Sequence, residues 1–245
     1  MKRVMLVVAY DGTNYCGWQI QANGITVQEE LNRCLSKLLK EPIQTVGASR
    51  TDAGVHALGN VAVFDTAARM PAEKISYALN TYLPEDIRIQ YAAEVAADFH
   101  PRYCESEKTY EYRILNRRFP LPTQRLYTYF YHYKLDVEKM REGASFLVGR
   151  HDFASFCGAN AQVKSTVREV TGIDIEKKDD VITIQVRGRG FLYNMVRIIA
   201  GTLIEIGNKQ YPPEKMGEIL RACDRQQAGP TAPACGLTLK EIKFL

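Results

Sequence analysis

Residues 43–66, IQTVGASRTDAGVHALGNVAVFDT, hold two apolar segments separated by a loop with a central glycine. The flanking runs IQTVGAS and GNVAVFDT are typical of β-strands. The loop between them carries one carboxylate, Asp52, close to Arg50 and His56. A carboxylate on a tight turn at the end of a strand is held rigidly and can project into a cleft. Asp52 is therefore a candidate catalytic residue, and an ordinary turn aspartate that caps backbone amides is the alternative.

The sequence allows several roles for Arg50 and His56. Either side chain can be a salt-bridge partner, a cap for the turn or a contact to a phosphate group. Their position beside Asp52 makes both of them candidate site residues.

The segments around this loop predict the order β-α-β-β-α-β for the first half of the chain. The helix before the loop starts with a Thr-x-x-Glu capping box and has its apolar residues on one face. The outer elements are a strand at 2–10, a helix at 26–40, a helix at 71–83 and a strand at 87–96. This order is that of a ferredoxin-like unit.

The second half repeats the order more loosely. Its predicted elements are a strand at 108–116, a helix at 136–149, a hairpin at 167–188, helices at 190–207 and 212–224, and a strand at 237–245. The sequence thus predicts an α+β protein of two ferredoxin-like halves, 1–105 and 106–245. We expect the halves to share a mixed, mostly antiparallel sheet with a central active-site cleft.

Composition and motifs exclude several classes of protein. Hydrophobic residues make up 46% of the 245 residues, which is typical of a folded protein. The longest apolar runs are well short of the roughly 20 residues that cross a bilayer, and the N-terminal run lacks a signal-peptide cleavage site. We therefore expect a cytoplasmic protein without a membrane segment. The net charge of +4 permits an anionic partner without requiring one.

The cysteines and histidines do not form a recognisable ligand set. The six cysteines are scattered without a CxxC pair, and the four histidines lie far apart. This pattern predicts reduced thiols and no metal site. The runs GVHALGN and RGRGFLYN lack the P-loop lysine and the third glycine of a dinucleotide fingerprint, so neither predicts a nucleotide cofactor.

Arg197 lies within the apolar helix predicted at 190–207. An unpaired buried guanidinium is very costly, so Arg197 must either extend to solvent or pair with a buried carboxylate. Asp52 is the candidate for that carboxylate, and such a pair would keep it ionised.

Tyrosines mark two further segments. In RLYTYFYHYK (125–134) four alternating tyrosines would share one face of a strand: Tyr127, Tyr129, Tyr131 and Tyr133. That face is favoured as a core or subunit contact, and a stacking platform for unpaired bases is the alternative. In KTYEYRI, Tyr110 shares a strand face with Tyr112, and either ring can be core or part of a pocket.

Taken together, these motifs resemble the TruA family of tRNA pseudouridine synthases from end to end. The matching segments, in chain order, are YDGTNYCGWQIQ, TVQEEL, GASRTDAGVHA, SEKTYEYRI, HDFASF, GFLYNMVRIIAGTL and AGPTAPACGLTL. The run RTDAGVHA is already specific, and FLYNMVR with AGPTAPACGL makes a chance match very improbable. Ser49 departs from the pattern, since a glycine often precedes the arginine.

The resemblance implies an isomerase that converts uridine to pseudouridine in tRNA without a metal or organic cofactor. Asp52 falls on the essential aspartate of the family and Tyr110 on its active-site tyrosine. Arg197 falls on the arginine paired with the aspartate, and Arg50 on the arginine that helps to expel the target nucleotide. A homodimer that acts on the anticodon stem-loop, at positions 38–40, is also implied.

Leu192 and His56 are further candidate binding residues, and two other functions are possible. Leu192 is expected to line the base pocket together with Phe191, and His56 to contact the substrate. A non-catalytic RNA-binding or RNA-folding protein and a structural or solute-binding protein are the alternatives, and neither explains an intact set of Asp52, Tyr110 and Arg197. Which uridines are modified, and whether Asp52 attacks the sugar or removes a ribose proton, does not follow from the sequence.

Overall fold

The structure, a computed structural model, describes residues 1–159 and 163–245. Contacts within the chain divide it into two compact units. Unit 1 comprises Met1–Ser106 with Thr238–Leu245, and unit 2 comprises Glu107–Leu237. The C-terminal segment Thr238–Leu245 thus belongs with the first half, whereas the expected boundary at residue 106 grouped it with the second. Within the described ranges, no helix is long and apolar enough to cross a membrane.

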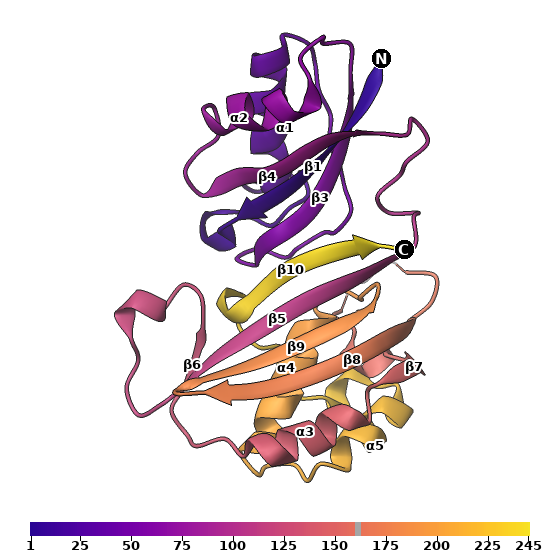
Figure 1. The fold of residues 1–245 in the computed structure, drawn as a ribbon. Helices are drawn as coiled ribbons and strands as arrows, with labels where there is room; N and C mark the ends of the chain where they lie inside the picture. The colour runs from indigo at the N-terminus through magenta and orange to yellow at the C-terminus, as the bar shows by residue number, and fades with distance from the viewer. Residues whose placement is uncertain (160–162) are drawn as a thin grey trace. The chain divides into compact units, whose positions relative to one another are not determined.

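Unit 1 contains the predicted β-α-β-β-α-β order (Figure 1). Its elements are β1 (Lys2–Tyr10), η1 (Gly12–Asn14), α1 (Val27–Leu39), β2 (Val46–Gly47), β3 (His56–Thr66), α2 (Ala72–Asn80), β4 (Ile87–Val95) and β10 (Leu237–Phe244). The strands follow the order β4-β1-β3-β10, and the short β2 pairs with β3. All of these pairs are antiparallel except β3 with β10, which is parallel.

The core of unit 1 lies between its helices and one face of its sheet. Alternate residues of β1 are fully buried (Val4, Leu6 and Val8), as are the apolar residues of α1 one turn apart, Val27, Leu31 and Leu35. The predicted cap is present, since the Thr26 hydroxyl accepts from the backbone N of Glu29 at 3.3 Å. The two periodicities that predicted the strand and the helix therefore correspond to the buried faces.

Unit 2 is also an α+β unit with a mixed, mostly antiparallel sheet. Its elements are β5 (Ser106–Asn116), η2 (Pro122–Gln124), β6 (Tyr129–Tyr131), α3 (Val137–Ser145), β7 (Gly149–Asp152), η3 (Ala154–Phe156), β8 (Val167–Lys178), β9 (Val181–Arg189), α4 (Met195–Gly207), α5 (Lys215–Ala222), η4 (Arg225–Gln227) and η5 (Ala234–Gly236). The strand order is β5-β9-β8-β7, all antiparallel, and β6 adds to β5 in parallel. The predicted α+β class is confirmed.

The strand predicted over residues 125–134 is wrong in its extent, because only Tyr129–Tyr131 form a strand. Before it, Gln124 O accepts from the backbone N of Tyr127 at 3.1 Å and from the Thr128 hydroxyl at 2.9 Å, which closes a turn. After it, the Asn116 amide donates to Tyr131 O and Tyr133 O at 2.9 and 2.7 Å. Tyr127 and Tyr133 therefore do not extend a common strand face.

Candidate active site

Asp52 lies on a tight turn between β2 and β3. The backbone N of Val55 donates to Asp52 O at 3.1 Å, and Gly54 takes a positive φ of 76°. The burial pattern alternates along the segment that enters the turn, since Ser49 and Thr51 are buried whereas Arg50 is exposed and Asp52 half-buried. The inward residues fix the backbone, and the two candidate functional side chains face away from the core of unit 1.

A buried hydrogen-bond network centred on Asn60 fixes the segment that enters the turn. Asn60, with no exposed surface, donates to Ser49 O at 3.1 Å and to the Tyr10 hydroxyl at 3.3 Å. Its side-chain oxygen accepts from the backbone N of Ser49 at 3.3 Å. The Tyr10 and Thr51 hydroxyls lie 2.7 Å apart. Ser49 and Thr51, which flank Arg50, are therefore fixed. This pre-organises the backbone that leads to Asp52.

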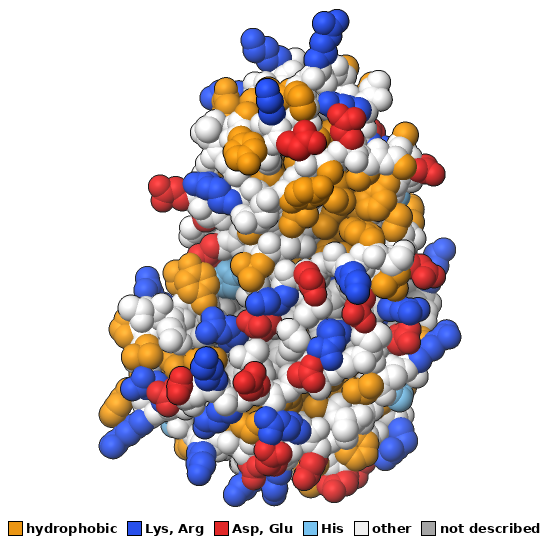
Figure 2. All heavy atoms as spheres, in the orientation of Figure 1, with side chains coloured by type: hydrophobic (Ala, Val, Ile, Leu, Met, Phe, Trp, Pro, Cys, Tyr) orange, Lys and Arg blue, Asp and Glu red, His pale blue; other side chains and the backbone are white. Residues whose placement is uncertain are grey.

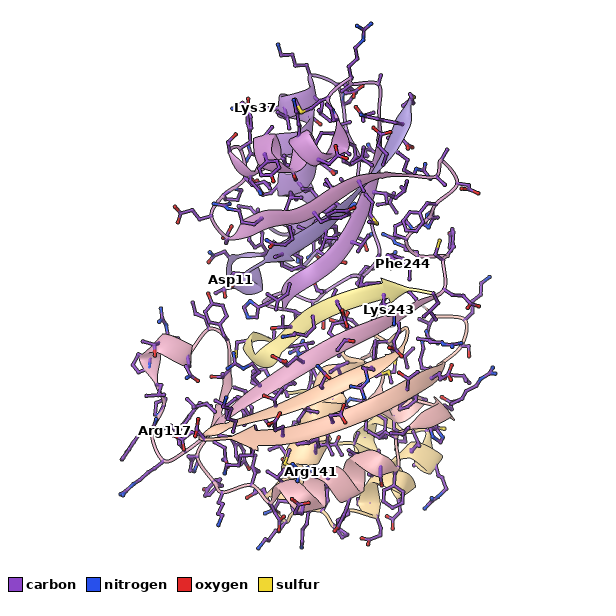
Figure 3. All side chains as sticks on the ribbon, viewed as in Figure 1. Asp11, Lys37, Arg117, Arg141, Lys243 and Phe244 are labelled. Atoms are coloured by element: carbon purple, nitrogen blue, oxygen red, sulfur yellow. The ribbon has the colours of Figure 1, made fainter. Side chains whose placement is uncertain are left out.

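The loop at residues 11–18 also forms hydrogen bonds to the turn. Trp18 N donates to Thr51 O at 3.1 Å, and Gly54 N donates to Tyr15 O at 3.3 Å. His56 is 5% exposed, and its Nδ1 lies 3.1 Å from both Gly12 N and Asp11 Oδ1. Figure 3 labels Asp11 at this loop. These contacts join the 11–18 loop to the start of β3 through the His56 ring.

Gly17 brings the 11–18 loop close to the backbone of the Asp52 turn in a left-handed conformation. Its φ is +87°, and a Cβ there would lie 2.5 Å from Thr51 O. Gly17→Ala is expected to lower the melting temperature, because left-handed strain of about 1–2 kcal/mol adds to a clash with fixed backbone. Gly190→Ala is the matched control, since its φ is +81° but its nearest neighbour would be Arg168 Cδ at 3.9 Å. Equal losses in the two variants would show that the contact with Thr51 is unimportant.

In unit 2, Tyr110 packs against Phe191, which follows β9. Tyr110 lies on β5 opposite Val186 of β9 and is 7% exposed. Its ring meets that of Phe191 edge to face, with centroids 5.2 Å apart and an interplanar angle of 84°. Leu192 is 5% exposed. Two predicted pocket residues, Tyr110 and Phe191, are therefore in contact, and Leu192 follows Phe191 in the chain. Aromatic rings of this kind can pack against a planar base.

Arg197 lies on the first turn of α4, half-buried and held by hydrogen bonds. Its Nε donates to Ala232 O and its Nη1 to Asn194 Oδ1, both at 2.8 Å. Ala232 N in turn donates to Arg197 O at 3.1 Å. The side chain is therefore fixed within unit 2 and does not simply extend into solvent.

The segment 228–236, AGPTAPACG, supplies the Ala232 carbonyl and packs tightly against α4. A Cβ on Gly201 would lie 1.8 Å from Pro230 O, so only glycine permits this approach. Gly229 N donates to the Thr202 hydroxyl at 3.0 Å, and the Tyr112 hydroxyl donates to Pro233 O at 2.8 Å. Burial raises the pKa of Tyr112 above its usual range, which keeps this donor protonated.

The predicted site residues thus fall into two groups. Arg50, Asp52 and His56 lie on the turn of unit 1, whereas Tyr110, Leu192 and Arg197 lie in unit 2. Sequence reasoning missed the supporting residues Tyr10 and Asn60, although a polar residue inside the apolar run GNVAVF is a usable signal. In the part of the chain that the structure describes, no three His, Cys, Asp or Glu side chains group as a metal site would require.

Comparison with known proteins identifies the family. A family model described as tRNA pseudouridine synthase matches residues 6–104 and 144–244. Proteins named tRNA pseudouridine synthase A from Thermoanaerobacter sp. and Acetivibrio thermocellus are 48% and 45% identical, and each match covers 100% of both chains. The protein of that name from Brevibacillus brevis is 46% identical, also over 100% of both chains. The chain therefore belongs to the tRNA pseudouridine synthase family, isomerases that convert uridine to pseudouridine in tRNA.

Proposed function

We propose that this chain isomerises uridines of the anticodon stem-loop of tRNA, at positions 38–40, without a metal or organic cofactor. The observation that carries the proposal is the Asp52 turn, whose backbone is fixed by Asn60 on one side and by the 11–18 loop on the other. Such support suits a carboxylate that must meet a reacting atom in one orientation.

The target uridine must first leave its stack. Extruding a stacked base costs a few kcal/mol, and chemistry on the sugar or base is blocked until it is done. Arg50 is exposed and two residues from Asp52. We assign to it the role of filling the vacated space or holding the displaced backbone.

Asp52 then acts as an anion on the ribose. It either attacks carbon 1′ or removes a ribose proton, and in both routes the bond from carbon 1′ to N1 of uracil breaks. The freed uracil rotates and its carbon 5 bonds to carbon 1′. In the first route this breaks the ester bond to Asp52, and in the second the removed proton returns to the ribose. Carbon 5 loses a proton and N1 gains one, so the overall reaction is an isomerisation.

We also assign roles to residues of unit 2. Tyr110 stacks on the base and takes part in the proton transfer from carbon 5, while Leu192 and Phe191 line the pocket. Arg197 pairs with Asp52 and keeps it ionised. We assign to His56 a contact with the substrate.

The test is to map pseudouridine in unmodified tRNA transcripts treated with the pure protein. We expect pseudouridine within positions 38–40 without any added cofactor, and none with the Asp52 variant considered below. A protein that binds these transcripts but forms no pseudouridine would be the RNA-binding alternative. The proposed substrate also makes the cytoplasm the expected compartment.

We further propose that the protein is a homodimer. One face of the unit 1 sheet carries apolar residues that are not fully covered: Tyr91 is 55% exposed, and its neighbours Met5, Val7 and Ala93 are half-buried. Figure 2 shows hydrophobic side chains gathered over unit 1 on the face in view. Light scattering is expected to give about twice the 27.7 kDa of one chain. A single-chain mass at micromolar concentration would overturn this proposal.

A further inference from the structure

Arg102 is fixed beside the start of the Asp52 turn, although it is far from it in sequence. Its Nε donates to Gly47 O at 2.8 Å, at the end of β2. The segment around it is itself held, since Tyr103 N and Cys104 N donate to His100 O at 3.0 and 3.1 Å. Because Nε is engaged, the two Nη groups are the part of Arg102 that remains to bind a ligand.

Arg102 and Arg50 are like charges on neighbouring segments, because Arg102 is hydrogen-bonded to Gly47 O, three residues before Arg50. Burial lowers the pKa of Arg102, and the positive charge of Arg50 lowers it further. Over residues 1–159 and 163–245, no carboxylate forms an ion pair with either guanidinium. Other arginines of the chain do have such partners, as the pairs Arg3–Asp65 and Arg187–Asp174 show. A pair of uncompensated cations is the arrangement that a bound anion stabilises.

An aromatic pair adjoins these cations. The Tyr103 side chain is 84% exposed, and its ring stacks on His100 with centroids 4.1 Å apart and an interplanar angle of 18°. Exposed aromatic rings beside basic side chains are typical of surfaces that bind unpaired nucleotides. The chemistry of the surface therefore favours the phosphate of a nucleic acid over a small free anion.

We propose that Arg102 and Arg50 together bind one backbone phosphate of the substrate RNA, next to the extruded uridine, with Tyr103 against the adjoining nucleotide. Guanidinium groups donate two parallel hydrogen bonds to phosphate, so two of them can surround one phosphate group. Because Arg102 is anchored on Gly47, this contact fixes the RNA backbone relative to the strand that leads to Asp52. The inference rests on the proposed function, and it makes Arg102 a positioning residue.

The test measures the affinity for an unmodified tRNA transcript as a function of salt concentration. Arg102→Gln is expected to weaken binding about tenfold at low salt and to reduce the slope of log affinity against log salt by about 1. Arg69→Gln is the matched control, because it removes the same charge from an exposed position of unit 1 and should leave the slope unchanged. Arg102→Lys should retain the slope, since it keeps a cation that can contact phosphate. A purely structural role for Arg102 would not be rescued in this way.

The double variant tests whether the phosphate is shared. Because we expect the shared phosphate to need both guanidinium groups, either single variant should release it. Arg50→Gln with Arg102→Gln is then expected to lose no more slope than either single variant, whereas separate phosphates would cost about 2. That larger loss, or an Arg102→Gln slope equal to that of Arg69→Gln, would overturn the inference. Pseudouridine formation by the wild type is scored separately, so a failure of the proposed function is distinguishable from a failure of this contact.

Discussion

Asp52→Asn is expected to reduce pseudouridine formation by roughly 10⁴-fold or more while tRNA affinity stays within about one order of magnitude of the wild type. Asparagine has nearly the same shape but is neutral, so it can neither attack carbon 1′ nor accept a ribose proton. Affinity is expected to persist because it comes mostly from cationic contacts to phosphate, which a carboxylate does not make.

The fold should tolerate this replacement. The bond that closes the turn uses the backbone oxygen of Asp52, and the network beneath it uses Ser49, Asn60 and Thr51. Asp98→Asn is the matched control, because Asp98 is an exposed aspartate of the same unit. Single-turnover rates and filter binding would be measured for both variants. Activity of Asp52→Asn within tenfold of the control would remove Asp52 from the catalytic role.

The regular elements were predictable wherever a buried face repeats locally. The helix predicted over 26–40 is α1 at Val27–Leu39, and the hairpin predicted over 167–188 is β8 with β9. The helix expected from residue 190 begins only at Met195, because Asn194 takes a left-handed φ of 60°. The residues before it, Phe191 among them, pack near Tyr110 instead of forming a first helical turn.

Contacts between distant segments were not predictable in this way. The parallel pairing of Thr238 with His56 places the C-terminal strand in unit 1, and no local pattern encodes it. The same holds for Arg102 on Gly47 and for the carbonyl of Ala232 on Arg197. The Asp52 turn was predictable because glycine, carboxylate and flanking strands are adjacent in sequence. Its support was not, because Tyr10 and Asn60 reach it only through the sheet.

Arg197→Met tests the proposed pairing with Asp52 through its pH dependence. Without the opposing charge, a carboxylate in a water-poor pocket has a higher pKa, because desolvation disfavours its charged form. Asp52 acts as an anion, so its neutral form would then persist to higher pH. We therefore expect activity to collapse near neutral pH and to recover partly as pH rises. Arg197→Lys should be milder but not silent, since a point charge does not replace the guanidinium fork.

The folded state should survive Arg197→Met, so that a loss of activity would report on the chemistry and not on unfolding. The variant loses the side-chain bonds to Ala232 O and Asn194, but the backbone bond from Ala232 N to residue 197 and the bond from Gly229 N to Thr202 remain. Methionine also suits the apolar surroundings of α4. Circular dichroism would establish folding, and single-turnover pH–rate profiles would be compared for the wild type and both variants. A folded Arg197→Met protein with the wild-type rate and pH dependence would show that Arg197 only anchors the 228–236 segment and does not act on Asp52.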